Sequence, residues 1–392
     1  MPTSETNPLD SRRRRQGPLT RSATHGDTPR RGPLADLSTE ELLARHPAGQ
    51  SKPLQVLDLI LSRFNMQHTA LEKTVSHKTR HDRALFLRRF FRDLKARAGF
   101  RRIPDPRSLR QKHVHAMVTL WQREPLAPAT IQTYLSFLRG LALWLRKPGM
   151  IGPPASYGLQ PAEYERHEYA QRDKSWTPKG IDVDALLKEI GIFDARACAC
   201  MRLMQALGLR KKESLLIKPF VDVVSASETD VPEAQRTAEW LVEVHGKGGR
   251  KRWVAIDSPL AQDAIANAQR IVATRNAHMG DPNLDLKRNL RRLAYVMEKF
   301  GITDRDLGVT GHGLRHEVFN DSYEDRTGQP SPVRGGGPVD PDLDARARLA
   351  VAQLAGHARP RAAGAYLGSP VVKRNEAKKG PPGAEVDGLS ST

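Results

Sequence analysis

The clearest β-structure signal in this sequence is one stretch, "EWLVEVHGKGGRKRWVAID", at residues 239–257. We interpret Trp240–Val244 and Arg252–Ile256 as two alternating β runs, and a glycine-rich basic turn separates them. A period of two is typical of half-buried strands, and glycines in the connection favour a hairpin. Most other periodic segments have helical spacing. The sequence therefore predicts a mainly α-helical protein that carries a small β-sheet.

Residues 51–155 have the apolar spacing of a compact helical domain of about four helices. Short Gly/Pro breaks separate the segments "LQVLDLILSRF", "HDRALFLRRFFRDLKARAG", "SLRQKHVHAMVTLWQRE" and "APATIQTYLSFLRGLALWLRK". Residues 1–50 are predicted to form a disordered basic N-terminal arm, because arginines and prolines occur there without periodicity. Near the end of this arm, Ser38 and Glu41 are spaced as a capping box for a short helix, "STEELLARH".

Residues 156–180 are predicted to be an interdomain linker, in which Trp176 is either a contact residue or a stray linker aromatic. Residues 181–370 are predicted to form a mixed α+β domain around the hairpin. Its later helices are expected near 258–277, 285–300, 312–325, 342–356 and 359–367. Residues 371–392 are predicted to be a flexible C-terminal tail.

The charge balance favours an anionic partner. Sixty-three Lys and Arg residues against 44 Asp and Glu residues give a formal net charge of +19. Self-repulsion of this size does not help folding, so nucleic acid is the leading candidate partner. A membrane is disfavoured, because there is no apolar run of about 18 residues, and the start of the chain is not a signal peptide. Cys198 and Cys200 suit neither a disulfide nor zinc and are expected to be buried thiols in a reducing cytoplasm.

Several basic or nucleophilic residues in 181–370 lie at unusual positions. In "TGHGLRHEVFND", residues 310–321, His312, Arg315 and His316 share one face of a predicted helix that holds no carboxylate among them. Arg210 follows a helix end, and Lys247 and Lys251 lie in the hairpin turn. His357 follows a helix-ending glycine, with Tyr366 nine positions later (366 − 357). Singly, each has an ordinary structural explanation as a solvated face, a helix cap, a solvated turn or a core aromatic.

Taken in order, these elements resemble the tyrosine recombinase, or phage integrase, family. The family motifs are an arginine in "GLRxxE", a lysine in "GKG", then "HxLRH", "LxGH" and a tyrosine nine residues later. The matching residues are Arg210 with Glu213, Lys247, His312 to His316, His357 and Tyr366. The resemblance covers about residues 50–370. Two segments depart from it: residues 222–237 lengthen the path to the hairpin, and 324–343 form a long Pro/Gly insertion before His357.

The resemblance implies a fold and a reaction. The fold is an N-terminal helical core-binding (SAM-like) domain and an α+β catalytic domain, which form a C-shaped clamp around DNA. In the reaction, Tyr366 attacks a DNA phosphodiester and forms a 3′-phosphotyrosyl link, without metal, ATP or another cofactor. The implied roles are phosphate binding by Arg210, Arg315 and His357, proton acceptance by His312, proton donation by Lys247, and support from Glu213 and His316. Lys251 competes with Lys247, which is favoured because it occupies the "GKG" position.

The implied partners are double-stranded DNA, further copies in a homo-tetramer on paired sites, and DNA-bending accessory proteins, all at the cytoplasmic nucleoid. One alternative is a type IB topoisomerase, which shares the tyrosine chemistry and needs no partner site. Another is a non-catalytic DNA-binding protein of the same fold. The "HxLRH" motif and the helical domain favour recombination over the first alternative. Tyr366, which a pure binder does not need, argues against the second.

Overall fold

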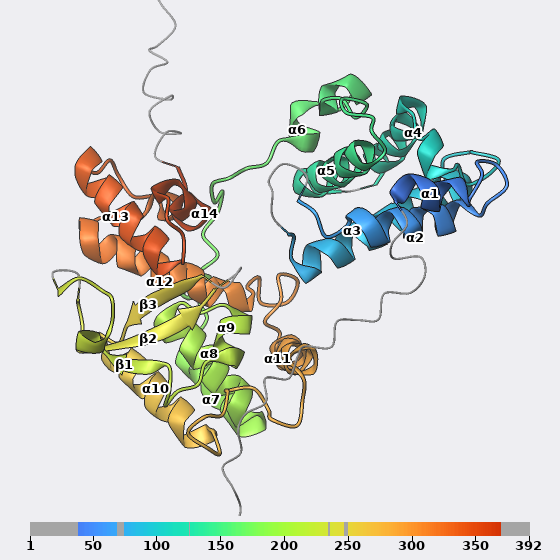
Figure 1. The fold of residues 1–392 in the computed structure, drawn as a ribbon. Helices are drawn as coiled ribbons and strands as arrows, with labels where there is room; N and C mark the ends of the chain where they lie inside the picture. The colour runs from blue at the N-terminus through green and yellow to red at the C-terminus, as the bar shows by residue number, and fades with distance from the viewer. Residues whose placement is uncertain (1–37, 69–73, 125, 234–235, 247–249, 370–392) are drawn as a thin grey trace, which may run out of the picture. The chain divides into compact units, whose positions relative to one another are not determined.

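The computed structural model describes residues 38–68, 74–124, 126–233, 236–246 and 250–369 (Figure 1). The chain divides into two compact units, Met1–Glu165 and Arg166–Thr392, each with its own hydrophobic core. The boundary lies inside the linker predicted at 156–180. The prediction of a mainly helical protein with a small sheet is confirmed. Residues 1–37 of the predicted arm, Lys247 and the predicted C-terminal tail lie outside the described residues.

The N-terminal unit consists of helices with short connections. They are α1 (Thr39–Ala44), α2 (Pro53–Phe64), α3 (His77–Ala96), α4 (Gln111–Gln122), α5 (Pro128–Trp144) and α6 (Pro161–Tyr164). Aromatic and aliphatic side chains of α2 to α5 form the core, in which Phe90, Phe91 and Leu135 are fully buried. The predicted capping box is present, since Ser38 and Glu41 each accept a hydrogen bond from the other's backbone N–H. The end of the predicted disordered arm therefore contains an ordered helix, α1.

The second unit surrounds a small sheet with helices. The helices are α7 (Val183–Phe193), α8 (Ala195–Leu207), α9 (Lys211–Leu216), α10 (Pro259–Ile271), α11 (Leu286–Lys299), α12 (Gly311–Thr327), α13 (Pro341–Leu354) and α14 (Gly364–Leu367). Helix α8 is apolar on nearly every side and packs against α7, α10 and α12, which makes it the central helix of this core. Cys198 and Cys200 lie in it as buried free thiols. Burial raises the pKa of Cys200 to about 12.

The sheet is antiparallel, in the order β1 (Val223–Ser225), β2 (Trp240–His245), β3 (Lys251–Ala255). The hairpin of β2 and β3 is the predicted one, whereas β1 lies in the segment 222–237 and was not predicted. In the register, Val244 pairs with Arg252 and Val242 pairs with Val254. Val242, Val244, Arg252 and Val254 are all buried, so they mark the inner face of the sheet. Lys251 and Trp253 alternate with them and belong to the outer face.

The linker and the insertion both contain residues buried in the second unit. Trp176 is fully buried, and its indole N–H donates to the carbonyl of Thr310 over 2.9 Å, so it is a core contact and not a stray aromatic. Within 324–343, buried Ser331 bonds the side chain of Asn320 on α12. Arg334 pairs with Asp321 on α12 and with Asp173 of the linker. The insertion is therefore docked on α12.

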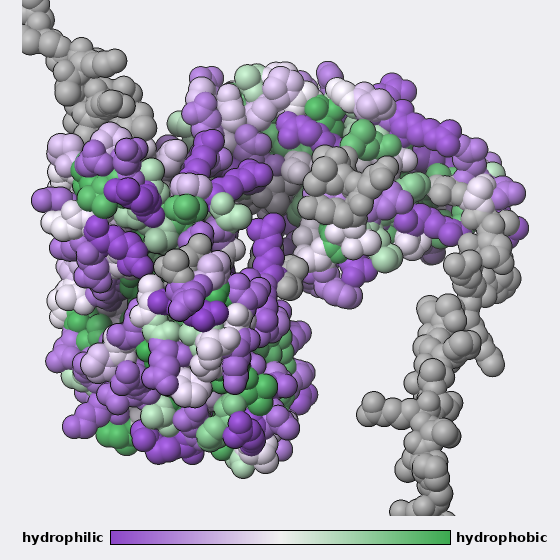
Figure 2. Space-filling model, turned by 60° about the vertical axis from the view of Figure 1, so that its left-hand side comes forward, coloured by the Kyte–Doolittle hydropathy of each residue, from purple (hydrophilic) through white to green (hydrophobic). Residues whose placement is uncertain are grey.

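The surface is predominantly polar. Figure 2 shows hydrophilic side chains over most of the visible face, with apolar ones in small separate groups. In the described parts of the chain, no helix combines the length and apolarity that crossing a bilayer requires.

Candidate functional site

Arg315, in the first turns of α12, is a fully buried cation held by backbone carbonyls. Its Nη2 donates to the carbonyl of Ala355 over 2.7 Å, and its Nη1 donates to the carbonyl of Gly208. These carbonyls lie at the C-terminal ends of α13 and α8, where the helix dipole places partial negative charge. Burial lowers the pKa of Arg315 to about 10, so the guanidinium stays charged at neutral pH. Its nearest carboxylate oxygen, on Glu213, is 3.8 Å away.

Arg210 shares one of these acceptors with Arg315. Its Nη2 donates to the carbonyl of Ala355 over 3.0 Å, and its Nη1 donates to Glu213 over 2.6 Å. Its backbone N–H also donates to Glu213, over 2.8 Å, so the Glu213 side chain caps the start of α9. One carbonyl therefore places two arginines that are far apart in the sequence side by side.

Glu213 is a buried carboxylate surrounded by three guanidinium groups. Arg252 donates to both of its oxygens, over 3.0 and 2.8 Å, in addition to the bonds from Arg210 and the approach of Arg315. Burial alone would raise the pKa of Glu213, but the bonds and charges of Arg252 and Arg210 outweigh it and lower the pKa to about 2. The four groups carry three positive charges and one negative charge, which leaves +2 (3 − 1) without a carboxylate partner.

Tyr366 closes this cluster from α14. It is 6% exposed, and its hydroxyl oxygen accepts a hydrogen bond from Nε of Arg315 over 3.2 Å. Its ring contacts Phe319 and His316 edge to face, with centroids 4.6 and 4.9 Å apart, and the His312 ring lies 5.9 Å away. The tyrosine, the arginine and both histidines of the predicted motif therefore lie together.

The histidines of the cluster are neutral at pH 7 in this arrangement. Desolvation by the surrounding protein, the charge of Arg315 and nearby lysines lower the pKa of His312 to about 4, although His312 is exposed on one side to solvent and is not a buried residue. Burial, followed by the neighbouring His312, lowers the pKa of buried His316 to about 3. Burial and then the charges of Arg210 and Arg315 also lower the pKa of half-buried His357. An anion entering this site would raise all three pKa values.

Two backbone features hold the first turn of α12 and the loop before His357. A Cβ on Gly313 would lie 2.7 Å from the Trp176 ring and would clash with the carbonyl of Lys174, so only glycine permits this close approach. Gly356 has a φ of 78° and ends α13, so that the next residue, His357, turns towards the arginines.

The two candidate lysines have different outcomes. Lys247 lies outside the described residues. Lys251 pairs with Glu243 over 2.9 Å and lies 4.4 Å from the Trp253 ring centre, on the outer face of the sheet. The structure therefore does not bring Lys251 to the cluster. Gly246, directly before Lys247, does lie there, since a Cβ at that position would be 3.7 Å from Glu213 and 3.6 Å from Arg252.

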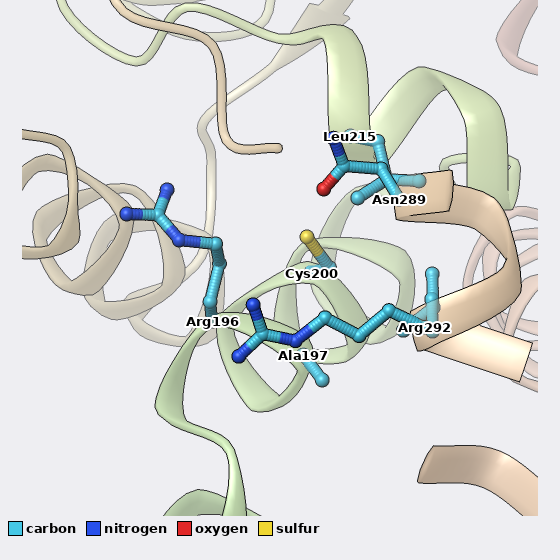
Figure 3. A pocket seen from close by; sticks show the side chains of 7 residues that line it. Arg196, Ala197, Cys200, Leu215, Asn289 and Arg292 are labelled. Carbon is cyan, nitrogen blue, oxygen red and sulfur yellow. The ribbon is translucent and has the colours of Figure 1, made fainter. Parts of the chain in front are cut away.

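A separate hollow between α8 and α11 holds none of the motif residues. Figure 3 shows Arg196 and Arg292 beside Cys200 and Asn289 on its wall. Both arginines already have partners: Arg196 donates to the carbonyl of Met279 over 2.9 Å, and Arg292 donates to Asp194 over 2.7 Å. The guanidinium of Arg196 is thus held by a backbone carbonyl and that of Arg292 by a carboxylate.

A known family model matches part of each of the two units. The phage integrase N-terminal model matches residues 61–147, and the integrase model matches residues 175–322. The chain belongs to the phage integrase family. The integrase-model match includes Arg210, Glu213 and the His312–His316 motif, and it ends before His357 and Tyr366. The prediction for His357 therefore rests on motif spacing, and that for Tyr366 on spacing and on its contacts with Arg315 and the histidines.

Solved integrases and recombinases align with most of this chain at low sequence identity. A lambda integrase tetramer bound to a Holliday junction has 15% identity and a TM-score of 0.47, over 81% of this chain and 77% of that chain. XerH recombinase bound to its difH substrate has 13% identity and a TM-score of 0.46, over 84% and 85%. The Tn1549 transposon integrase has 12% identity and a TM-score of 0.45, over 82% and 98%. No curated protein matches the integrase sequence significantly.

Arg252 is a member of the cluster that the sequence motifs did not include. The available signal was its position in the predicted strand, two residues before Val254 and four before Ile256, which places it on the same inward face. A charged residue at such a position requires a buried partner, and the partner is Glu213.

Proposed function

We propose that this integrase is a site-specific tyrosine recombinase, which cuts and rejoins double-stranded DNA through a 3′-phosphotyrosyl intermediate. The observation that carries the proposal is the convergence of Arg210, Arg315 and Tyr366. Both guanidinium groups bond the carbonyl of Ala355, and Arg315 also bonds the tyrosine hydroxyl. An excess of two positive charges beside a nucleophile suits a phosphodiester, whose transition state accumulates negative charge.

In the cleavage step, Oη of Tyr366 forms a bond to phosphorus as the bond from phosphorus to the 5′-oxygen breaks. The phenolic proton goes to His312, which is neutral and therefore able to accept it. The leaving 5′-oxygen takes a proton from Lys247. Arg210, Arg315 and His357 bind the nonbridging oxygens, with Glu213 and His316 in support. Because one phosphoester replaces another, the 5′-hydroxyl of a second strand can reverse the step and rejoin the DNA without ATP.

The buried state of the cluster adds a requirement to this reaction. Arg315 has no exposed surface and Tyr366 very little, so a DNA phosphate reaches them only when α14 moves away from α12. Helix α14, which carries Tyr366, has a single turn, so we propose that it is the segment that moves.

Family membership also supports a set of partners. We propose that the integrase binds double-stranded DNA at the cytoplasmic nucleoid and assembles as a homo-tetramer on paired sites, with DNA-bending accessory proteins. The net charge of +19 favours extensive phosphate contacts, so binding should weaken steeply as salt rises.

A nicked suicide duplex tests the proposal, because loss of the short 5′ fragment traps the covalent adduct. Tyr366→Phe should bind the duplex and form no adduct, whereas Tyr295→Phe, at an exposed tyrosine of α11, should form it at the wild-type level. Adducts that persist in Tyr366→Phe would identify another nucleophile. Wild-type protein that binds without forming an adduct would indicate the non-catalytic alternative. Plasmid relaxation without a partner site would indicate the topoisomerase alternative.

A further inference from the structure

Arg252 is a buried cation that the proposed reaction does not use. It lies on the inner face of the sheet, 7% exposed, and both of its terminal nitrogens bond Glu213, over 3.0 and 2.8 Å. Its Nε has no hydrogen-bond partner among the described residues. A bidentate pair of this kind fixes the orientation of both groups more firmly than a single bond does.

The same side chain lies against two further parts of the cluster. A Cβ on Gly356, directly before His357, would be 3.3 Å from Cδ of Arg252. A Cβ on Gly246, directly before Lys247, would be 3.6 Å from Nη1 of Arg252. Arg252 is thus in contact with the loop that presents His357, with the start of the hairpin turn and with the carboxylate that holds Arg210.

The charge of Arg252 changes what Glu213 can do to the other arginines. Because Arg252 bonds both oxygens of Glu213, much of the carboxylate's negative charge is balanced by a residue that is not expected to touch DNA. Without Arg252, the Glu213 carboxylate would interact with Arg210 and Arg315 alone. The net charge of the remaining cluster would fall from +2 (3 − 1) to +1 (2 − 1). A buried carboxylate competes directly with phosphate for a guanidinium.

We propose that Arg252 is a positioning residue of the recombination reaction: it engages Glu213 so that Arg210 and Arg315 remain available to the DNA phosphate. This inference rests on the proposed function. It assigns Arg252 a role in the rate of strand cleavage and only a small role in DNA affinity.

Single-turnover cleavage of the suicide duplex at saturating DNA tests the proposal in full-length protein. Arg252→Gln should lower the rate constant by about 100-fold, a typical effect of weakening one transition-state charge contact. The dissociation constant for the duplex should stay near the wild-type value. Arg252→Lys keeps the charge and loses the bidentate geometry, so its cleavage rate constant should lie between those of the wild type and Arg252→Gln. A merely structural role would lower the amplitude, which reports the active fraction, and leave the rate constant unchanged.

The double variant Arg252→Gln/Glu213→Gln gives the sharpest result. Glutamine at 213 retains an oxygen for the N–H of Arg210 and removes the competing charge, so the double variant should cleave about tenfold faster than Arg252→Gln alone. The double variant contains no unpaired buried carboxylate, so it should fold even if Arg252→Gln does not. In that case its rate constant is compared with that of Arg252→Lys and should be at least as high. A double variant slower than the single one, or than Arg252→Lys in that case, overturns the proposal.

The wild-type control separates the two hypotheses. If wild-type protein forms the Tyr366 adduct and Arg252→Gln cleaves at the same rate constant, the role of Arg252 is wrong and the proposed function stands. If wild-type protein forms no adduct, the proposed function is wrong and the role of Arg252 in cleavage is wrong with it.

Discussion

Nε of Arg315 donates a hydrogen bond to the hydroxyl oxygen of Tyr366, 3.2 Å away, across 51 positions of sequence. The guanidinium carbon also lies 5.6 Å from the centre of the tyrosine ring. Because the other nitrogens of Arg315 bond Gly208 and Ala355, this one side chain joins the ends of α8 and α13 to α14. The contact would bring a permanent cation to the oxygen that gains negative charge as its proton leaves.

Replacement of Arg315 by lysine should lower the cleavage rate by about 100-fold or more, because one ammonium group cannot reach three acceptors and a phosphate together. DNA affinity should change little, since most contacts are expected to involve other phosphates. Single-turnover cleavage and gel-shift titration measure the two effects. Arg326→Lys, on the last turn of α12, is the matched control and should keep the wild-type rate. A near-wild-type rate for Arg315→Lys would contradict the phosphate-binding role.

Protein stability should fall between pH 7 and pH 5 because of His316. Its pKa is about 3 in the folded protein and about 6.5 in an unfolded chain. Below pH 6.5 the unfolded state binds a proton that the folded state cannot, so stability is lost as pH falls and the loss ends near pH 3. The contribution between pH 7 and pH 5 is about 2 kcal/mol.

Urea unfolding at the two pH values measures this contribution. On going from pH 7 to pH 5, His316→Gln should lose about 2 kcal/mol less unfolding free energy than the wild type. His167→Gln, at an exposed histidine, should keep the wild-type pH dependence. Equal pH dependence in wild type and His316→Gln would show that the imidazole takes up its proton without cost to the fold.

The hairpin, the helical N-terminal unit and the order of the motif residues could be predicted because they depend on local periodicity and spacing. Strand β1 could not, since Val223–Ser225 is too short for a pattern of alternation. Trp176 remained ambiguous because its burial depends on Thr310 and Glu317, more than 130 positions away. The pairing of Arg252 with Glu213 also joins distant segments, 39 positions apart. Only the fold brings such partners together.

The packing of the insertion at 324–343 could not be predicted for a related reason. Its prolines and glycines are typical of a loose loop, yet Ser331 and Arg334 bond α12 and the linker. Gly368, just after α14, lies close to Val333 of this insertion. The insertion therefore lies beside the helix that carries Tyr366, which its composition alone could not indicate.

Replacement of Gly313 by alanine should destabilise the second unit by about 1–3 kcal/mol, the usual range for overpacking a core. The new methyl group would overlap the Trp176 ring and the carbonyl of Lys174, and the first turn of α12 would have to shift. Thermal unfolding measures the loss. Gly337→Ala is the matched control, because a Cβ there meets nothing within 4 Å and should leave the melting temperature unchanged. Equal melting temperatures for the two variants would show that the 174–176 segment moves aside freely.

Removal of the Tyr169 ring should speed adduct formation if movement of α14 limits the reaction. This ring lies against Gly364 at the start of α14, where a Cβ would be 2.7 Å from its Cε1, and the N–H of Ala170 donates to the carbonyl of Gly364 over 2.8 Å. Both contacts hold α14 over Arg315. Tyr169→Ala loses the first contact and keeps the second, so the helix should open more often and remain attached.

The expected result for Tyr169→Ala is a single-turnover rate constant about two- to tenfold above wild type, the effect of about 0.4–1.4 kcal/mol on the opening equilibrium. Limited proteolysis should show faster cleavage after Arg359 and Arg361, which precede α14. Tyr169→Phe keeps the ring over Gly364 and serves as the matched control, with wild-type values in both assays. If Tyr169→Ala shows faster proteolysis and an unchanged or slower rate constant, opening of α14 does not limit cleavage and a later step controls the rate.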